Sequence, residues 1–237
     1  VIPFMKVVDA EMLAFSQGVT RRGSYAAYLD ISHPEIEEFL DVRKPTGGDI
    51  NRKSINLHHA VVIPDAFMQL IDRATREEGF DDGWDLIDPH SGEVKKTVSA
   101  KTLWVKLIQN RVETGEPYIM FGDAVDEALP EFQKNLGLKV NQSNLCSDDD
   151  RTAVCCLSSV NLEKFDEWSK HPHFIEDLIR FLDNVLEAFI EKAPDSLAKA
   201  KYSAQQERSI GLGAMGFHAY LQKNNIPFEP PMAKGFN

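Results

Sequence analysis

Hydrophobic residues recur at helical spacing in several stretches of the chain. The first stretch runs from Phe4 to Phe15 and stops at a polar, glycine-containing segment, which predicts a helix that leads into a loop. A serine, a proline and a glutamate at Ser32, Pro34 and Glu35 have the spacing of a capping box, which predicts another helix start. Further helices are predicted from Pro64 to about Arg76, from Ser99 to Gly115, and from Phe174 to Ile190.

Short runs rich in β-branched and aromatic residues alternate with these helices. They predict strands at residues 25–31, 55–62, 84–87, 117–121, 143–147 and 153–162. Repeated alternation of strand and helix favours an α/β fold with a mainly parallel sheet or barrel and helices outside it. We find no internal repeat and no evident linker, so we expect one domain.

Composition excludes only a few classes of protein. The chain has 237 residues, 43% hydrophobic and 27% charged, which is typical of a globular domain with a buried core. Its formal net charge of -11 disfavours general binding to nucleic acid or to an anionic membrane. The three cysteines, two of them adjacent, and the lack of a long apolar run favour a cytoplasmic protein. Because residues 233–237 follow a helix-like segment without a closing element, we expect a piece of something larger.

One predicted strand places three polar side chains with possible catalytic chemistry on the same face. In an extended segment Asn144, Cys146 and Asp148 project from the same face, with about 7 Å between alternate positions. An amide, a thiol and a carboxylate would then face the same space. Taken alone, this pattern favours a half-buried strand in which the cysteine packs as a small hydrophobic residue. The rest of the sequence has to decide between the two interpretations.

Six segments together resemble a known family. They are Ser16-Gln-Gly with the following Arg21-Arg-Gly23, Asn56-Leu-His-His59, Gly115-Glu-Pro-Tyr118, Gln142-Ser-Asn-Leu-Cys146, Arg151 to Leu162, and Arg208-Ser-Ile-Gly-Leu-Gly213. In this order and spacing they are similar to the middle of the catalytic α (large) subunit of class I ribonucleotide reductases. The resemblance implies part of a ten-stranded α/β barrel with a central finger loop, residues 1–237 forming part of the barrel domain. The N-terminal regulatory region and the C-terminal part of the barrel would be absent.

The resemblance also implies catalytic roles for individual residues. Cys146 would be the transient thiyl radical that removes the 3′ hydrogen of the ribose, and Asn144 would hydrogen-bond the substrate hydroxyls. Cys155 matches the cysteine that donates reducing equivalents, and its partner cysteine would lie upstream of Val1. A thiyl radical carries no charge, so a dry barrel interior suits it. Asp148 stands where the family has glutamate.

A second implied site is the loop through which a bound deoxynucleotide selects the substrate base. Arg21 is the candidate for contacting substrate phosphate or base and Gln17 for hydrogen-bonding the base, while Gly18 and Gly23 would let the loop change shape. Without the resemblance, the same residues would suggest an ordinary glycine-containing turn with solvated arginines. The candidate residues of this loop are Ser16, Gln17, Gly18, Arg21, Arg22 and Gly23.

The resemblance further implies the cofactors and partners of the protein. It implies no directly bound cofactor and no metal, a radical cofactor of the dimetal kind in a separate small (β) subunit, and nucleotide effectors such as dNTP or ATP. Expected partners are that radical-generating subunit, a second α subunit in a homodimer, nucleoside diphosphate substrates and a thioredoxin-type reductant. The activity would be reduction of ribonucleoside diphosphates for DNA synthesis. The alternative is a barrel fragment that is active only with its missing portions.

Two other patterns suggest different chemistry. Gly211, Gly213 and Gly216 match the dinucleotide-binding pattern, which would indicate a nicotinamide-dependent oxidoreductase, but the preceding residues are polar and do not predict a buried strand. We therefore interpret these glycines as positions of tight packing. Cys156 should point away from Cys155 and pack as a buried thiol, and a zinc site combining both cysteines with nearby histidines has the wrong spacing.

The sequence departs from the family pattern after Cys146. Only residues 147–154 separate Cys146 from Cys155, and the family has a longer stretch there. Shortening a loop that must reach the barrel centre would misplace Cys146 by more than catalysis tolerates. We therefore predict that residues are missing between Ser147 and Arg151, and that Asp148 is not the true counterpart of the family glutamate.

Overall fold

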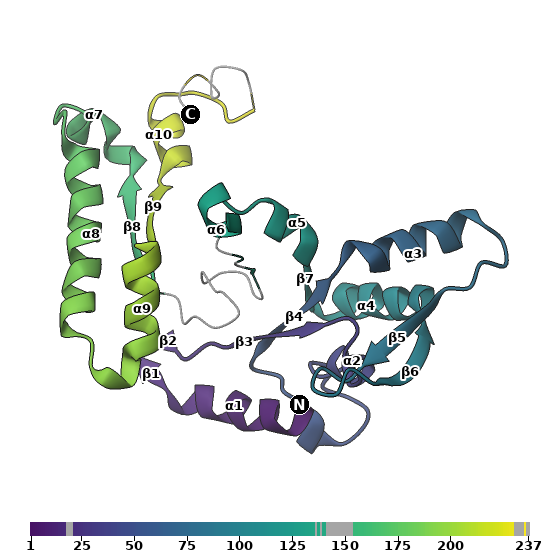
Figure 1. Cartoon of the computed structure of the whole chain (residues 1–237). Helices are drawn as coiled ribbons and strands as arrows, with labels where there is room; N and C mark the ends of the chain where they lie inside the picture. Colours follow the sequence, from purple (N-terminus) through teal and green to yellow (C-terminus); the bar gives the residue numbers. More distant parts are fainter. Residues whose placement is uncertain (18–20, 136, 138, 141–153, 230–234, 236–237) are drawn as a thin grey trace. The chain divides into compact units, whose positions relative to one another are not determined.

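The computed structural model describes residues 1–17, 21–135, 137, 139–140, 154–229 and 235. The chain forms two compact units, Val1–Ser143 and Asn144–Asn237 (Figure 1). We expected one domain, because the sequence has no evident linker and its amino-acid composition does not change at the border between these units. Each unit is described by itself.

The first unit is built on a parallel sheet. Its strands are β3 (Ala26–Asp30), β4 (His58–Ile63) and β7 (Tyr118–Phe121), with β4 in the middle. The sequence predicted all three strands and their parallel arrangement. Residues Ala60 and Val61 of β4 are completely buried, as expected for a central parallel strand that is covered on both faces.

The helices of the first unit are α1 (Ile2–Ala14), α2 (Ile36–Phe39), α3 (Asp65–Arg76), α4 (Ala100–Thr114), α5 (Gly122–Glu127) and α6 (Glu131–Asn135), with a 3₁₀ turn η1 (Ile50–Arg52). Three of them, α1, α3 and α4, lie close to the predicted positions, whereas α5 and α6 were not predicted. The Ser99 hydroxyl accepts the Thr102 N–H at 3.1 Å and so caps α4, which confirms the predicted start. Gly115 ends α4 in the left-handed conformation, with φ 80°.

The predicted capping box at Ser32 is wrong. Helix α2 begins only at Ile36, and its N-cap Glu35 makes no side-chain cap hydrogen bond. Instead, the Ser32 N–H donates to Asp30 Oδ1 at 2.7 Å, and the Glu35 N–H donates to His33 Nδ1 at 3.0 Å. These local side-chain acceptors make a turn that replaces the first turn of the expected helix.

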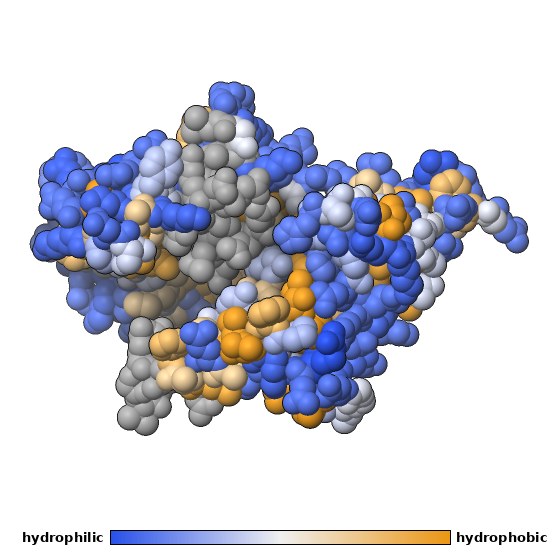
Figure 2. Space-filling view, turned by 60° about the horizontal axis from the view of Figure 1, so that its bottom comes forward, coloured by the Kyte–Doolittle hydropathy of each residue, from blue (hydrophilic) through white to orange (hydrophobic). Residues whose placement is uncertain are grey.

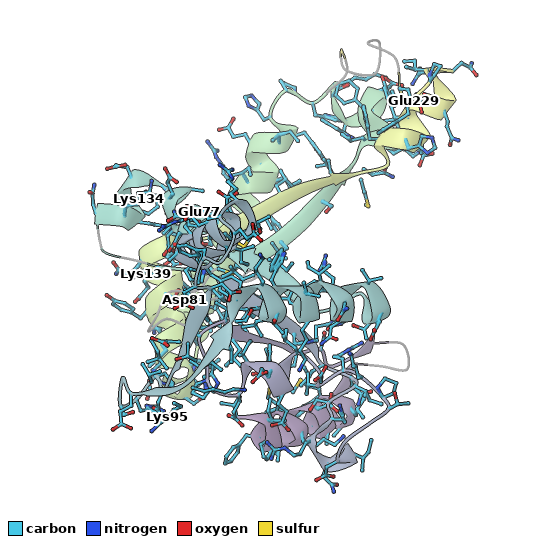
Figure 3. The ribbon with its side chains drawn as sticks, turned by 90° about the vertical axis from the view of Figure 1, so that its right-hand side faces the viewer. Glu77, Asp81, Lys95, Lys134, Lys139 and Glu229 are labelled. Carbon is cyan, nitrogen blue, oxygen red and sulfur yellow. The ribbon has the colours of Figure 1, made fainter. Side chains whose placement is uncertain are left out.

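Two antiparallel pairs extend from this unit. β5 (Gly83–Ile87) pairs with β6 (Val94–Ser99), and β1 (Ser16–Gln17) pairs with β2 (Arg21–Arg22). The sequence predicted β5 but not β6, because β6 is mostly exposed and lacks a hydrophobic face. Figure 3 labels three exposed charged side chains of this unit: Glu77 after α3, Asp81 before β5 and Lys95 in β6.

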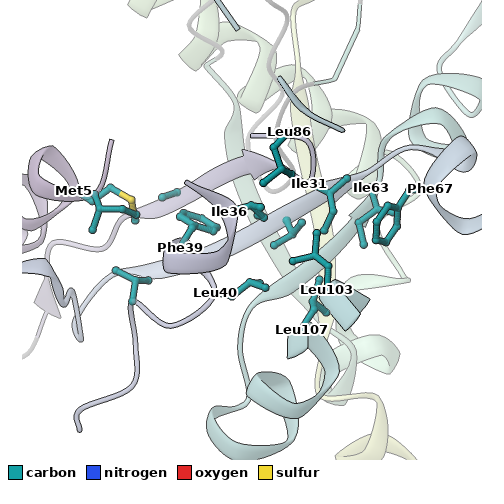
Figure 4. Packing of buried hydrophobic residues seen from close by; sticks show 14 of the residues in the cluster. Met5, Ile31, Ile36, Phe39, Leu40, Ile63, Phe67, Leu86, Leu103 and Leu107 are labelled. Carbon is teal, nitrogen blue, oxygen red and sulfur yellow. The ribbon is translucent and has the colours of Figure 1, made fainter. Parts of the chain in front are cut away.

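The core of the first unit collects apolar side chains from most of its elements. Figure 4 shows them packed on the parallel sheet, with Phe39 and Leu40 near α2, Phe67 in α3, Leu86 in β5 and Leu107 in α4. These five side chains are at most 1% exposed. Burial of this kind is the main contribution to the stability of a domain.

The second unit contains the parallel strands β8 (Cys156–Asn161) and β9 (Ile210–Met215). Its helices are α7 (Phe165–Trp168), α8 (Phe174–Lys192), α9 (Ala198–Glu207) and α10 (Phe217–Lys223), with 3₁₀ turns η2 (Leu162–Lys164) and η3 (Asp195–Leu197). Leu186 and Ile190 of α8, with Ala204 of α9, form a small core against one face of the strands. The predictions of β8 and α8 are confirmed, whereas β9 was not predicted.

The α/β character is confirmed, but a ten-stranded barrel is not seen. The strands that the structure describes lie in separate sheets of two or three strands, and among them no barrel closes. A barrel needs a continuous ring of hydrogen-bonded strands. The predicted strand at 143–147 lies outside the described residues. Within the described ranges, no helix is long and apolar enough to cross a bilayer.

Helix α4 allows a direct test of the core. Leu107 is completely buried, whereas Val112 on the same helix is 82% exposed. We expect Leu107→Ala to lower the free energy of unfolding by about 3 kcal/mol, because it removes buried methyl groups and leaves a cavity. Val112→Ala should change it by less than about 0.5 kcal/mol. Urea denaturation of both variants measures the difference, and equal effects would contradict this packing.

Candidate functional site

The start of β4 is bound to the segment before β7 through a buried carboxylate. Glu116 accepts hydrogen bonds from Nδ1 of His58, from Nδ1 of His59 at 3.0 Å and from the His59 backbone N–H at 3.1 Å. Strand register explains the contact: Ala60 pairs with Tyr118, so the residues two positions earlier lie side by side. The side chain of His59 is completely buried and that of Glu116 is 7% exposed.

Arg43 completes this cluster. Its Nε lies 3.6 Å from Glu116 Oε2, and its Nη1 donates to the Leu57 carbonyl oxygen. Burial by itself would raise the pKa of Glu116, but the hydrogen bonds from His59 and His58 and the Arg43 charge lower it to about 2. The ionised carboxylate therefore joins three segments of the first unit. Sequence reasoning did not identify this cluster, although both motifs that form it were part of the resemblance.

The loop at residues 16–23, predicted to select the substrate base, begins and ends at the C-terminal end of α1. Its backbone forms a short hairpin in which Ser16 pairs with Arg22 and Gln17 with Arg21. The Gly23 N–H donates to the Phe15 carbonyl oxygen at 2.6 Å. A Cβ on Gly23 would lie 2.8 Å from the Met12 carbonyl oxygen, so a close approach of two backbones requires glycine here. Gly18 lies outside the described residues.

Cys155 lies at the entry of β8, half-buried, and next to β9. A Cβ on Gly211 would lie 2.5 Å from Leu157 Cδ2 and 3.8 Å from the Cys155 sulfur, so the glycine allows close packing of Leu157 and lies within ordinary contact distance of the thiol. Leu157 follows on the same face and is 73% exposed. Cys156 points to the other face, where it packs against the core around Leu186. The predicted opposition of the two cysteines is confirmed.

The glycines that match the dinucleotide pattern do not form its turn. That pattern requires a glycine-rich turn between a strand and a helix, but Gly211 and Gly213 lie inside β9. A Cβ on Gly213 would lie 3.1 Å from Ser159 Oγ, and one on Gly216 would lie 2.3 Å from Asn161 Oδ1. The structure therefore favours tight packing of β9 on β8 and does not favour nicotinamide binding.

Several predicted residues lie outside the part of the chain that the structure describes. These are Asn144, Cys146 and Asp148, together with the short segment between Ser147 and Arg151. Among the described residues, no three His, Cys, Asp or Glu side chains gather into a group that could hold a metal ion. The described parts of the predicted sites thus lie in separate units: Cys155 with Gly211 in the second, and the base of the loop at residues 16–23 in the first.

The Glu116 cluster predicts a specific acid sensitivity. Because its folded-state pKa is lowered from 4.5 to about 2, the ionised carboxylate stabilises the fold above pH 4.5, and this stabilisation is lost as the pH falls toward 2. Its full contribution is of the order of 3 kcal/mol, because the pKa is lowered by about 2.5. The Glu116→Gln variant cannot titrate here, so the stability gap to the native protein should narrow below pH 4.5. Chemical denaturation across this pH range measures the gap, and a constant gap would contradict the assignment.

Comparison with known proteins identifies the family. The family model described as "Ribonucleotide reductase, barrel domain" matches residues 1–237. The chain is 45% identical to the ribonucleoside-diphosphate reductase large subunit of Invertebrate iridescent virus 3, over 97% of this chain and 45% of that protein. It is 32% identical to the ribonucleoside-diphosphate reductase subunit alpha of Chlamydia pneumoniae, over 100% of this chain and 25% of that protein.

A solved structure agrees with these sequence relatives. The class Id ribonucleotide reductase alpha subunit of Actinobacillus ureae has 33% sequence identity and a TM-score of 0.71, and the match covers 98% of this chain and 40% of that chain. The chain therefore spans less than half the length of each of these proteins. It belongs to the ribonucleotide reductase family, and its residues 1–237 match the barrel domain of that family.

Proposed function

We propose that this chain is part of the catalytic barrel domain of a ribonucleoside-diphosphate reductase large subunit, which reduces ribonucleotides to deoxyribonucleotides. The observation that carries the proposal is the match of residues 1–237 to the barrel domain, together with relatives that are named as such subunits. The activity belongs to the complete subunit, of which this chain supplies Cys146 and Cys155.

Two thiols of this chain have separate roles in the proposed reaction. Cys146, as a thiyl radical, removes the 3′ hydrogen atom of the ribose, while Asn144 hydrogen-bonds the sugar hydroxyls and holds the ring near the sulfur. Cys155 and a partner cysteine outside this chain supply two electrons and protons when the 2′ oxygen leaves as water, and they become a disulfide. The half-buried position of Cys155 supports this role, because the thiol has limited contact with water.

Residues 16–23 are proposed to form the loop through which the bound effector selects the substrate base. In this proposal Gln17 and Arg21 contact the substrate base or phosphate, and the loop backbone formed by Ser16, Arg22 and the glycines carries them. The hairpin pairing of the loop ends supports the proposal, because it gives both arms a defined path from α1 to β3. The effectors would be nucleoside triphosphates, dNTP or ATP.

The proposed partners are a second large subunit and a small subunit that holds a dimetal radical cofactor, with a thioredoxin-type protein as reductant. Figure 2 brings forward the face that carries α1 and shows hydrophobic residues gathered on it in orange. On this helix Phe4 is 78% exposed and Val7 is 63% exposed. An apolar surface of this kind supports contact with another subunit.

The length of one match bears on the proposal that residues are missing after Cys146. The match to the viral subunit extends over 282 residues, more than the 237 residues of this chain. That relative therefore has residues without a counterpart here. The short segment between Ser147 and Arg151 is the place that we propose, and in that case Asp148 is not the counterpart of the family glutamate.

The neighbouring cysteines provide a matched pair for testing the function. In a complete large subunit with this sequence and its small subunit, Cys155→Ser should lower deoxynucleotide formation by about a hundredfold or more, because the thiol pair cannot form. Cys156→Ser should retain activity within about a factor of three, because this thiol only packs against α8. Chromatographic assay of the deoxynucleotide product measures both. Equal losses in the two variants, or full activity of Cys155→Ser, would contradict the assignment.

A further inference from the structure

Helix α1 carries one buried carboxylate. Asp9 is 1% exposed, and its Oδ1 accepts the backbone N–H groups of Leu57 at 2.7 Å and Asn56 at 2.9 Å. Its Oδ2 accepts the Asn56 side-chain amide at 3.1 Å. Three hydrogen bonds from two adjacent residues thus bind the middle of α1 to the segment that enters β4.

The N-terminal half of this helix also packs into the core of the first unit. The buried residues of α1 are Ile2, Met5 and Asp9, whereas Leu13 and Phe15 near its C-terminal end are 45% and 57% exposed. Asp9 is therefore the last buried residue of α1 before the loop at residues 16–23. Within the described residues Asp9 makes an ion pair with Lys6, whose Nζ lies 3.9 Å from Oδ2 and whose side chain is 38% exposed, so the pair contributes little.

Both ends of the loop are attached to the part of α1 that Asp9 holds. The Gly23 N–H donates to the Phe15 carbonyl oxygen, and the missing side chain of Gly23 allows close contact with the Met12 carbonyl oxygen. A rotation or shift of α1 would consequently move the two arms of the loop together. Two residues separate Gly23 from β3, which pairs with β4.

We propose that Asp9 is a positioning residue for the loop at residues 16–23, through which it fixes the loop relative to the central strand β4. The inference rests on the proposed function of this loop in selecting the substrate base. Hydrogen bonds of a buried carboxylate to backbone N–H groups are strong and directional, so they define both the position and the rotation of α1. A displacement of about 1 Å in a positioned group reduces the rate of a reaction by up to about a hundredfold.

The test uses the complete large subunit with its small subunit, and measures reduction of a purine and a pyrimidine nucleoside diphosphate with each deoxynucleoside triphosphate effector. We expect Asp9→Ala to reduce the effector-dependent preference between the two substrates by about tenfold or more. Asp9→Asn keeps an oxygen that can accept both backbone N–H groups, so it should retain most of the preference. The ratio of the two rates is the readout, because a loss of folded protein lowers both rates equally.

A matched control and a second variant separate positioning from stability. Asn110 is also buried in the first unit and donates to the Leu40 carbonyl oxygen at 2.7 Å, so Asn110→Ala should lower stability without changing the preference. Gly23→Ala places a Cβ against the Met12 carbonyl oxygen and should reduce the preference as Asp9→Ala does. If Asp9→Ala does not fold, Asn56→Ala takes its place, because it removes the side-chain amide bonded to Asp9 Oδ2. Asn56→Ala should then reduce the preference, and an unchanged preference would overturn the proposal.

The outcomes distinguish a failure of the role proposed for Asp9 from a failure of the function proposed for the loop. If the native protein reduces both substrates under effector control but Asp9→Ala and Gly23→Ala keep the same preference, the positioning role of Asp9 is wrong. An equal loss of preference in Asn110→Ala would also overturn it, because the effect would then follow stability. If the native protein shows no effector-dependent preference at all, it is the proposed function of the loop that fails.

Discussion

Two buried carboxylates at the start of β4 hold the first unit together. Asp9 of α1 accepts the N–H groups of Asn56 and Leu57, and Glu116 binds both His58 and His59. Buried backbone and histidine donors without acceptors would be costly, and the carboxylates remove that cost while joining distant segments. Four consecutive residues therefore connect α1, the central strand and the segment before β7. The loop proposed to select the substrate is attached to this connection through α1.

Much of the fold could be predicted from local sequence signals. Helix α4 has both of its ends encoded, by the Ser99 hydroxyl and by Gly115, and the prediction of both ends is confirmed. Where local signals compete, prediction failed: Asp30 and His33 accept backbone N–H groups and replace the helical turn expected at Ser32. Strand β6 was missed because its exposed residues have no hydrophobic face, and its stability comes from pairing with β5.

The candidate site shows the same division between local and long-range information. Alternation along one strand was enough to predict that Cys155 and Cys156 face opposite sides. The contact between His59 and Glu116 depends on strand register over a separation of 57 residues, which periodicity does not encode. Both residues stood in motifs that pointed to the family, but only the register shows that these motifs contact each other. Gly211 and Gly213 likewise fitted two chemistries in the sequence, and their place inside β9 separates them.

Hydrogen exchange tests the connection at the start of β4 most directly. The amides of Asn56 and Leu57 donate to Asp9 and that of His59 donates to Glu116, so all three should exchange slowly in the native protein. In Asp9→Ala, exchange at residues 56 and 57 should accelerate by about tenfold or more, while the amides of α8 in the second unit remain unchanged. Fast exchange of these amides in the native protein, or unchanged exchange in the variant, would contradict the account.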